Sequence, residues 1–556
     1  MSEKTLRRKA SRAGWLVGLS LALLVAACGQ SGTQSGSASK TNSTPGLSVY
    51  NMGNAAEPAS LDPHHSQGTW EDAIIGDLMM GLTTESVTGE PLPGAAERWE
   101  TSADGLTWTF HLRDHQWSDG QPVTADDFVY AWRRILDPKT AAPYAYFLYL
   151  IKNAESVNTG KMPATALGIT AMDSKTLTVQ LEHPAPYLTQ YLMHMTTYPV
   201  PRHVVEAKGD AWSRPGNYVG NGAFTLKAWI PNDHITLEKN SKFWDAANVK
   251  TDRVVFYPTS DYVAALKRFR AGELDSQDRL PEQEIDWLHE NMPEVLRLDP
   301  ILTTEFLAVN EARKPFNDVR VREALNLAID RETITEKIDK IGDIAAYGLV
   351  PPRIANYPGG AAFTFKSLAQ DARVKRAQQL MTEAGYGPKK HLKTTLATRS
   401  ASADRLRIPA AIQAMWEAIY VDAEIVQNDA AVFYANLDQH NFDIGLAGWQ
   451  ADFNDPITML ELLRSTNANN WGGYKNPKYD ALLDQANHEL NLAKRGQLLR
   501  QAEDIMLGDY PMIPTYFWVS HALVRPYIKG WEANSKDLHR SRWISIDETA
   551  RAATRH

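Results

Sequence analysis

Cysteine is almost absent from this chain, which has one such residue, Cys28, among 556. A single cysteine excludes an internal disulfide, a cysteine-rich zinc site and an iron–sulfur cluster held by cysteines. Positive charge is also in deficit, because 58 Lys and Arg face 66 Asp and Glu and the formal net charge is −8. Nucleic acid is therefore not expected as a partner, since phosphate contacts need a basic protein face.

The motifs of several common enzyme chemistries are missing as well. The sequence has no GxxxxGK[ST] phosphate loop, no GxGxxG, no GxSxG nucleophile elbow and no HExxH. The adjacent His64 and His65 would diverge on an extended segment, which favours polar or ligand-lining histidines over a metal site. No cofactor and no metal are expected. A binding protein is favoured over an enzyme, although scattered carboxylates leave a secreted glycan or ester hydrolase as an alternative.

The N-terminus has the pattern of an export signal. Residues 1–12 are basic, and residues 13–27 are uncharged and largely apolar, which is short for a membrane-spanning helix. Residues 25–28 read Val-Ala-Ala-Cys, and small residues before a cysteine resemble the lipobox of bacterial lipoproteins. We predict that residues 1–27 are a signal peptide and that Cys28 becomes the lipidated first residue. The alternative is an ordinary cleavage site with an incidental cysteine.

A flexible tether is predicted after Cys28. Gly, Ser and Thr make up 12 of the 18 residues from 29 to 46, and such a composition forms no core. A coil of this kind has a root-mean-square reach of roughly 20–25 Å. The predicted location is therefore outside the cytoplasm, periplasmic or at the cell surface, with a lipid anchor in the membrane and the body of the protein in water.

Predicted strands and helices alternate irregularly beyond residue 46, and no repeat of fixed period is present. Residues 106–112 alternate like a strand, and Thr124 with Asp127 has the capping-box pattern of a helix that ends before Pro138. Two separate late strands are predicted at residues 513–519 and 522–524. This mixture predicts an α/β fold with mixed sheets.

Five segments resemble the family 5 extracellular solute-binding proteins, the peptide-binding subunits of bacterial ABC transporters, and most of all their oligopeptide-binding members. The segments occur in the family's order and span nearly the whole mature chain. They are residues 57–64 (EPASLDPH), 117–130 (WSDGQPVTADDFVY), 221–244 (beginning NGAF), 315–325 (PFNDVRVREAL) and 447–456 (AGWQADFNDP).

This resemblance implies a two-lobed periplasmic-binding-protein fold with a hinge and an extra domain. By matching segments, the first lobe is expected from residues 47–79, 204–303 and 520–556. The extra domain is expected from residues 80–203, and the second lobe from residues 304–519. A chain that crosses between lobes more than once makes a hinge, and ligands bind between lobes.

A receptor for peptides of many sequences must bind what all peptides share, namely the backbone and the terminal charges. The ligand's ammonium needs a carboxylate, and the resemblance implies Asp452 for this role. The alternative is a loop carboxylate that caps the following helix, for which Asp455 is the better candidate. The resemblance further implies Trp449 and Tyr144 as residues that line the cleft, although core packing is the ordinary role of such aromatic residues.

Residues from two further segments are expected at the ligand's backbone. They are Gln67, Gly68 and Thr69 on one wall, and Gly448 and Gln450 on the opposite wall. The chain departs from better-known relatives on the side of the ligand's carboxylate, because residues 437–446 contain no Lys or Arg and Ala430 stands where a tryptophan is expected. Arg405 could supply a replacement positive charge. Its alternative role, a solvated residue at a helix start, is slightly favoured.

The sequence therefore predicts a lipid-anchored receptor that binds oligopeptides and passes them to ABC permease subunits. It is expected to be a monomer without enzymatic activity. An alternative keeps the fold but changes the ligand to a dipeptide, a cell-wall peptide or a metal chelate.

Overall fold

The structure is a computed structural model that describes residues 46–399 and 406–554. The predicted signal peptide, Cys28 and almost all of the predicted tether lie outside the described residues, and so does Arg405. Within the described ranges, no helix is both long enough and apolar enough to cross a bilayer.

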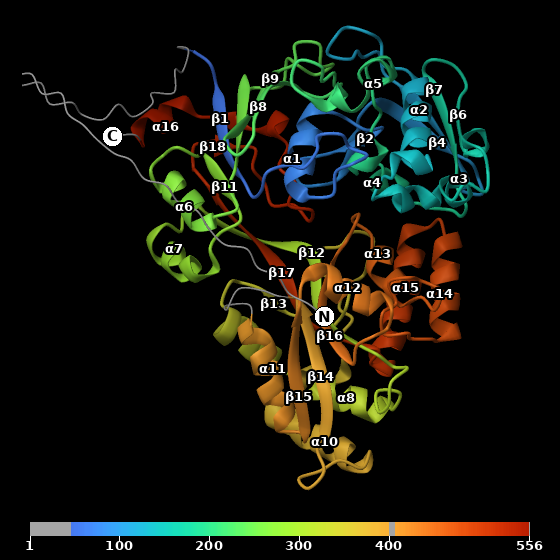
Figure 1. Cartoon of the computed structure of the whole chain (residues 1–556), viewed down its shortest axis with the longest axis vertical. Coiled ribbons are helices and arrows are strands. Elements are labelled where there is room, and N and C mark those ends of the chain that lie inside the picture. Colours follow the sequence, from blue (N-terminus) through green and yellow to red (C-terminus); the bar gives the residue numbers. More distant parts are fainter. Residues whose placement is uncertain (1–45, 400–405, 555–556) are drawn as a thin grey trace, which may run out of the picture. The chain divides into compact units, whose positions relative to one another are not determined.

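One large mixed sheet organises the body of the chain (Figure 1). We call one end of this sheet the β1 half and the other end the β14 half. The β1 half contains β8 (Phe224–Ile230), β9 (His234–Lys239), β10 (Arg253–Pro258), β1 (Val49–Asn54) and β11 (Ser276–Asp278). The β14 half contains β16 (Ile444–Gln450), β14 (Leu392–Arg399) and β15 (Val421–Asn428). Strand β1 runs parallel to β10 and β11, and β14 runs parallel to β15 and β16, whereas β9 is antiparallel to β8 and β10.

Two long strands, β12 (Leu296–Val309) and β17 (Met512–Val524), connect the two halves. Their antiparallel pairing covers residues 296–300 with 519–523 on the β1 side, and resumes from Thr304 opposite Phe517 on the β14 side. The register shifts between Pro300 and Thr304, so the ladder is irregular where the strands pass from one half to the other. The short β13 (Ile344–Ala345) pairs with β17 beside this point.

The prediction of two separate late strands is wrong, because β17 is continuous through residues 520 and 521. These two polar residues interrupt the apolar pattern, but both are accommodated inside the structure. Ser520 is buried and pairs with Asp299, while His521 pairs with Leu298 and its ring contacts the carbonyl of Ile341 at 2.6 Å. Contacts with distant residues thus keep these two polar residues in the strand, although they interrupt the apolar pattern by which a strand is predicted from the sequence.

A second sheet lies within residues 80–203. It has the order β4 (Ala96–Thr101), β5 (Thr107–Leu112), β7 (Thr176–Gln180) and β6 (Ile169–Ala171). Helix α2 (Ala125–Leu136) packs beside it and begins with the predicted capping box. The backbone N–H and the hydroxyl of Thr124 both donate to the carboxylate of Asp127, at 2.8 and 3.1 Å.

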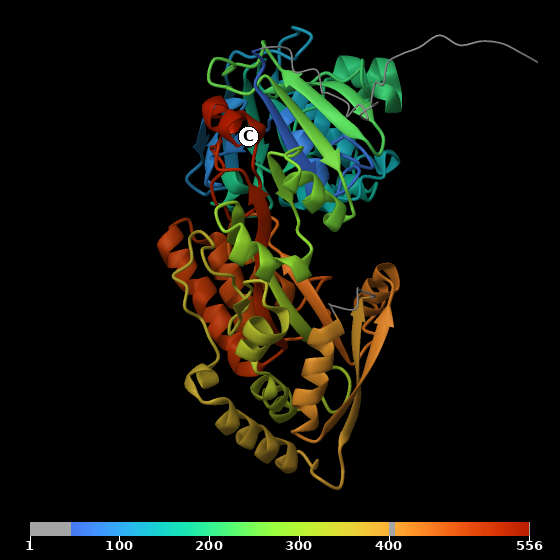
Figure 2. The same cartoon turned by 90° about the vertical axis from the view of Figure 1, so that its left-hand side faces the viewer.

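The remaining helices cover the two sheets. In Figures 1 and 2, α14 and α15 lie on the opposite side of the long strands from β14 and β15. The bounds of the other helices are α1 (Thr69–Leu78), α3 (Ala154–Asn158), α4 (Leu188–Tyr191), α5 (Arg202–Lys208), α6 (Tyr262–Arg270), α7 (Ile285–Asn291), α8 (Val319–Ala328), α9 (Arg331–Thr333), α10 (Gln370–Glu383), α11 (Arg407–Glu417), α12 (Ala430–Asp438), α13 (Ile457–Leu460), α14 (Pro477–His488), α15 (Leu492–Asp509) and α16 (Glu548–Ala553). Two short strand pairs, β2 (Thr83–Glu85) with β3 (Pro91–Pro93) and β18 (Ile528–Lys529) with β19 (Ser545–Ile546), complete the fold.

Candidate functional site

A cavity of about 150 Å³ lies where several distant segments meet. Six of the residues predicted for the site line it together: Gln67, Gly68, Thr69, Tyr144, Gln450 and Asp452. The segment from 534 to 538, between β18 and β19, forms another wall through Asn534, Lys536 and Leu538. Residues separated by hundreds of positions in the sequence therefore share one cavity.

Asp452 follows β16 in a loop that leads to α13. Its half-buried carboxylate accepts one side-chain hydrogen bond among the described residues, from the hydroxyl of Thr458 at 3.3 Å. Burial raises the pKa of Asp452, and the nearby ammonium of Lys536 opposes that rise. Asp455, the better candidate for capping, lies just before Pro456 at the start of α13, and its carboxylate accepts from the backbone N–H of Ile457 at 3.1 Å. Asp452 is thus a carboxylate in a cavity wall with much of its hydrogen-bonding capacity unused.

Aromatic rings surround this carboxylate. The ring of Tyr144 lies 5.5 Å from that of Tyr146 and 5.7 Å from that of His194. Burial, together with the charge of Asp452, raises the pKa of Tyr144. Burial lowers the pKa of His194 to about 3, so this ring is neutral at physiological pH. Phe453 stacks on Tyr187 with 4.9 Å between ring centroids, so the Asp452 loop packs on residues just before α4.

The segment of Gln67 and Gly68 is fixed by an internal carboxylate. Glu71 accepts the backbone N–H of Gln67 at 3.1 Å and that of Gly68 at 2.6 Å. A Cβ at position 68 would lie 2.5 Å from the indole of Trp70, so a larger residue there would require this ring to shift. These two N–H groups are therefore already used, which restricts the backbone pairing expected from this segment to its other polar groups.

One edge of β16 is open in the described part of the chain. Strand β16 pairs with β12 from Ile444 to Gln450, but β14 pairs with it only at Ile444 and Gly445. The edge beyond Gly445 is therefore available to an added strand. Gly448 lies on this stretch, and a Cβ there would lie 2.4 Å from the carboxylate of Glu305.

Trp449 lies on the same stretch but lines neither this cavity nor the larger one described next. Its ring packs edge-on against Trp471 with 6.3 Å between centroids. Its indole N–H has no hydrogen-bond partner among the described residues. Contact of Trp449 with a ligand remains a prediction.

A larger cavity, of about 540 Å³, is lined by residues of β12, β14, β16 and β17 and by residues that follow β1 and β11. Arg279 follows β11 and Arg399 ends β14, whereas Glu305 lies on β12. One guanidinium nitrogen of Arg399 lies 3.8 Å from the Glu305 carboxylate. Ala430 and Leu446 also line this cavity.

Sequence reasoning missed Arg279 and Arg399. Arg279 adopts a left-handed backbone conformation (φ 65°), which is uncommon for a residue other than glycine. Neither arginine belongs to a local motif. The two arginines line the same cavity only because the fold brings the end of β11 and the end of β14 together.

Comparison with known proteins identifies the fold. The profile of the bacterial extracellular solute-binding proteins, family 5 Middle, matches residues 90–471. The chain belongs to this family. Among curated relatives of this family 5 protein, the periplasmic oligopeptide-binding protein OppA of Salmonella typhimurium is 38% identical over 487 residues, 86% of this chain and 88% of the relative. The periplasmic murein peptide-binding protein MppA of Escherichia coli is 36% identical over 495 residues, 88% and 91% of the two chains.

Solved structures agree with the sequence relatives. The unliganded open form of the murein tripeptide-binding protein MppA superposes with a TM-score of 0.81 at 35% identity, over 90% of this chain and 98% of that chain. Haemophilus influenzae OppA in complex with RPPGFSPFR gives a TM-score of 0.75 at 33% identity, over 90% and 99%. The predicted α/β class, the mixed sheets and the two-lobed fold of the family 5 proteins are confirmed.

The EPASLDPH segment of this family 5 protein has a structural role. Asp62 is buried and accepts from Arg134 at 2.6 Å and from the indole of Trp212 at 3.0 Å. Arg134 also donates to the ring of buried His64 at 2.6 Å, and burial lowers the pKa of His64 to about 3. Within the described ranges, no group of three His, Cys, Asp or Glu side chains is arranged to hold a metal ion.

Proposed function

We propose that the chain is a solute-binding lipoprotein that captures oligopeptides between its two lobes and delivers them to an ABC permease. The observation that carries the proposal concerns Asp452, which lines the smaller cavity just after the open edge of β16. Among the described residues, its carboxylate accepts one side-chain hydrogen bond. A ligand's N-terminal ammonium would pair with Asp452. The ligand's backbone would add to β16 as a strand.

The larger cavity would receive the rest of the ligand. Leu446 lines this cavity and lies on β16, six residues before Asp452. An extended ligand therefore reaches it after its first few residues, at about 3.3 Å per residue. A cavity of this size has room for water, which can complete the hydrogen bonds of different side chains.

The relatives support a peptide ligand. Their names state oligopeptide and murein peptide binding, and one solved relative holds the peptide RPPGFSPFR. A cell-wall peptide is the second candidate, because a murein tripeptide-binding protein superposes with a TM-score of 0.81. Binding of a solute without chemical change needs no catalytic group, and we propose that the chain is not an enzyme.

We propose the lobe boundaries given by the family resemblance, residues 47–79, 204–303 and 520–556 for the first lobe and 304–519 for the second. Residues 80–203, which contain the β4–β5–β7–β6 sheet, would form the extra domain. The hinge would lie where β12 and β17 cross between the lobes. The register shift between Pro300 and Thr304 supports this position, because a broken ladder bends more easily than a regular one.

We expect the purified soluble domain to carry peptide from its source. Denaturation of the protein should release bound peptides. Mass spectrometry should show that these peptides share no sequence but have free N-termini. Calorimetry with one such peptide, added after the domain is stripped of ligand, should give saturable binding. Release of no peptide, together with no binding of any free-amine peptide, would contradict the proposed function.

Lipidation of Cys28 belongs to the same proposal, with the membrane as a partner. Replacing Cys28 with serine is expected to move the exported protein from the membrane fraction to the soluble fraction. Peptide affinity should not change, because the predicted tether of 18 residues rich in Gly, Ser and Thr would separate Cys28 from the fold. Cell fractionation and calorimetry measure the two effects. Retention of the variant in the membrane fraction would exclude Cys28 as the anchor.

A further inference from the structure

Lys536 connects the C-terminal segment to the loop of Asp452. Its half-buried ammonium donates to the carbonyl of Ala451 at 2.6 Å and to the carbonyl of Asp452 at 2.8 Å. The backbone supports this contact, because Leu302 donates to the carbonyl of Ser535 at 3.0 Å and accepts from the N–H of Ala451 at 2.7 Å. The ammonium is therefore held at a fixed place in the wall of the smaller cavity.

The hydrogen bonds of Lys536 go to the main chain of the loop and leave the Asp452 carboxylate open. Thr458 supplies the one side-chain hydrogen bond of that carboxylate within the described ranges. The positive charge nevertheless acts on the carboxylate, because the Lys536 ammonium is bonded to the main chain of the Asp452 loop and both residues line the same cavity. Lys536 thus differs from an ordinary salt-bridge partner, which would occupy the position that a ligand's ammonium needs.

Other charged and titratable groups near Asp452 do not replace this charge. Three tyrosines lie close enough for the charge of Asp452 to act on them. They are Tyr144 and Tyr146, at the start of η2 (Ala145–Leu150), and Tyr191 of α4, and burial raises the pKa of each. The neighbouring His194 ring is neutral. Two further carboxylates of the cavity wall, Asp72 and Glu85, are both paired with the buried Arg540.

We propose that Lys536 is a positioning residue of the amine-binding site, which keeps the Asp452 carboxylate ionised and aimed at the cavity without occupying it. This inference rests on the proposed function, in which Asp452 binds the ligand's ammonium. It assigns a role in amine recognition to a residue 84 positions away in the sequence. Lys536 also has an unfavourable effect, because its positive charge repels the ligand ammonium that Asp452 binds.

Lys536 favours the ionised form of Asp452 and repels the ligand's ammonium, and measurements at different pH values distinguish these two effects. Only the ionised carboxylate attracts an ammonium, so selectivity for a free amine is lost as the pH falls through the pKa of Asp452. Removing Lys536 raises that pKa further, since a favourable charge is gone. The loss then begins at a higher pH. Above that pH, the variant without Lys536 should prefer the free-amine ligand at least as strongly as the wild type does, because the repulsion between Lys536 and the ligand's ammonium is also removed.

The test is the ratio of affinities for one tripeptide with a free and with an acetylated N-terminus, measured by calorimetry between about pH 4 and pH 7. For Lys536→Met we expect the midpoint of this ratio to move up by about one pH unit, with no loss in the upper plateau. Lys536→Gln can still donate to the carbonyls and should show the same shift. Lys536→Arg keeps the charge and should restore the wild-type midpoint.

Lys529→Met is the matched control, because this exposed lysine lies in the same C-terminal region and, within the described part of the chain, bonds only the carbonyl of Pro526. Its ratio should follow the wild type at every pH. A merely structural role for Lys536 would weaken both ligands equally and leave the midpoint unmoved, which overturns the inference. A wild-type ratio near one at all pH values would instead contradict the amine-binding role of Asp452 itself.

Discussion

Replacement of Asp452 by alanine is expected to weaken binding of a free-amine peptide by two to four orders of magnitude. In the proposed complex the ligand's ammonium is removed from water and faces this carboxylate in a closed cavity. Removing one member of a buried charged pair costs about 3–5 kcal/mol, because the remaining charge stays desolvated without a partner. Calorimetry with the wild type and the variant, on one tripeptide at about pH 7, measures the change.

An acetylated peptide supplies the decisive comparison. It has no ammonium, so Asp452→Ala should change its affinity little. The two proteins and two ligands form a double-mutant cycle, in which the coupling energy isolates the contact between carboxylate and ammonium. Asp484→Ala serves as the matched variant, because this exposed aspartate lies on α14 and does not line either cavity. A coupling energy near zero would show that Asp452 does not read the N-terminus.

Local patterns predicted much of the secondary structure. The capping box of Thr124 and Asp127 and the alternation of residues 106–112 depend on neighbours within a few positions. Both elements are present, the strand as β5 from Thr107 to Leu112. The continuity of β17 through Ser520 and His521 was missed. Their partners, Asp299, Leu298 and the carbonyl of Ile341, are more than 175 residues away.

The residues of the candidate site also fall into those that could be predicted from the sequence and those that could not. The family resemblance predicted Asp452 and Tyr144, and the structure places both in one cavity. It did not predict Lys536, whose contacts with Ala451 and Asp452 span 85 and 84 residues. Arg399 was missed for the same reason, since its neighbour Glu305 belongs to another strand. Residues that act through tertiary contacts have no signal in their own sequence neighbourhood.

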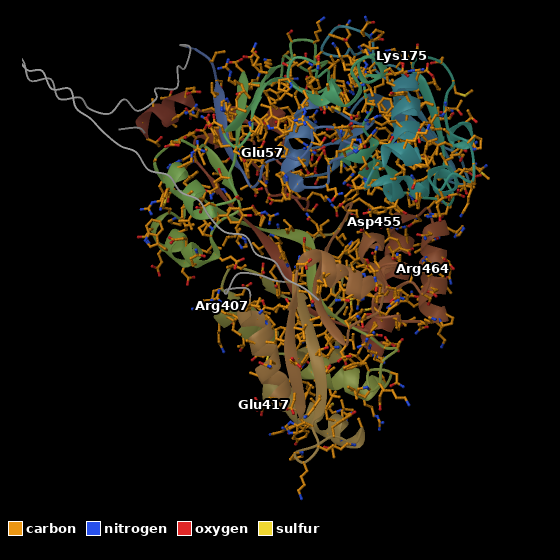
Figure 3. All side chains as sticks on the ribbon, viewed as in Figure 1. Glu57, Lys175, Arg407, Glu417, Asp455 and Arg464 are labelled. Carbon is orange, nitrogen blue, oxygen red and sulfur yellow. The ribbon has the colours of Figure 1, made fainter. Side chains whose placement is uncertain are left out.

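A buried ion pair beneath the Asp452 loop is expected to dominate the stability of this region. Asp455 and Arg495 are both fully buried, and their side chains meet at 2.6 Å (Figure 3 labels Asp455). Arg495 also lies over the ring of Tyr187, which stacks on Phe453. Its Nε and its second terminal nitrogen have no hydrogen-bond partner among the described residues, so Asp455 is its principal compensation.

Asp455→Ala should therefore lower the free energy of unfolding by about 3–5 kcal/mol, because it leaves the Arg495 charge buried without a carboxylate. The surface pair of Arg464 and Asp484 provides the control. Asp484 is exposed, so Asp484→Ala should cost less than about 1 kcal/mol. Urea denaturation followed by tryptophan fluorescence measures both values.

The double variant Asp455→Ala/Arg495→Met distinguishes the charge from the packing. It removes the uncompensated cation, and replacing a buried pair by apolar side chains is often neutral or stabilising. We therefore expect the double variant to be more stable than Asp455→Ala alone, although it carries one more substitution. If the two losses simply added, the destabilisation would come from lost packing and from the lost hydrogen bond to Ile457. In that case the ion pair would not be what holds the Asp452 loop against Tyr187.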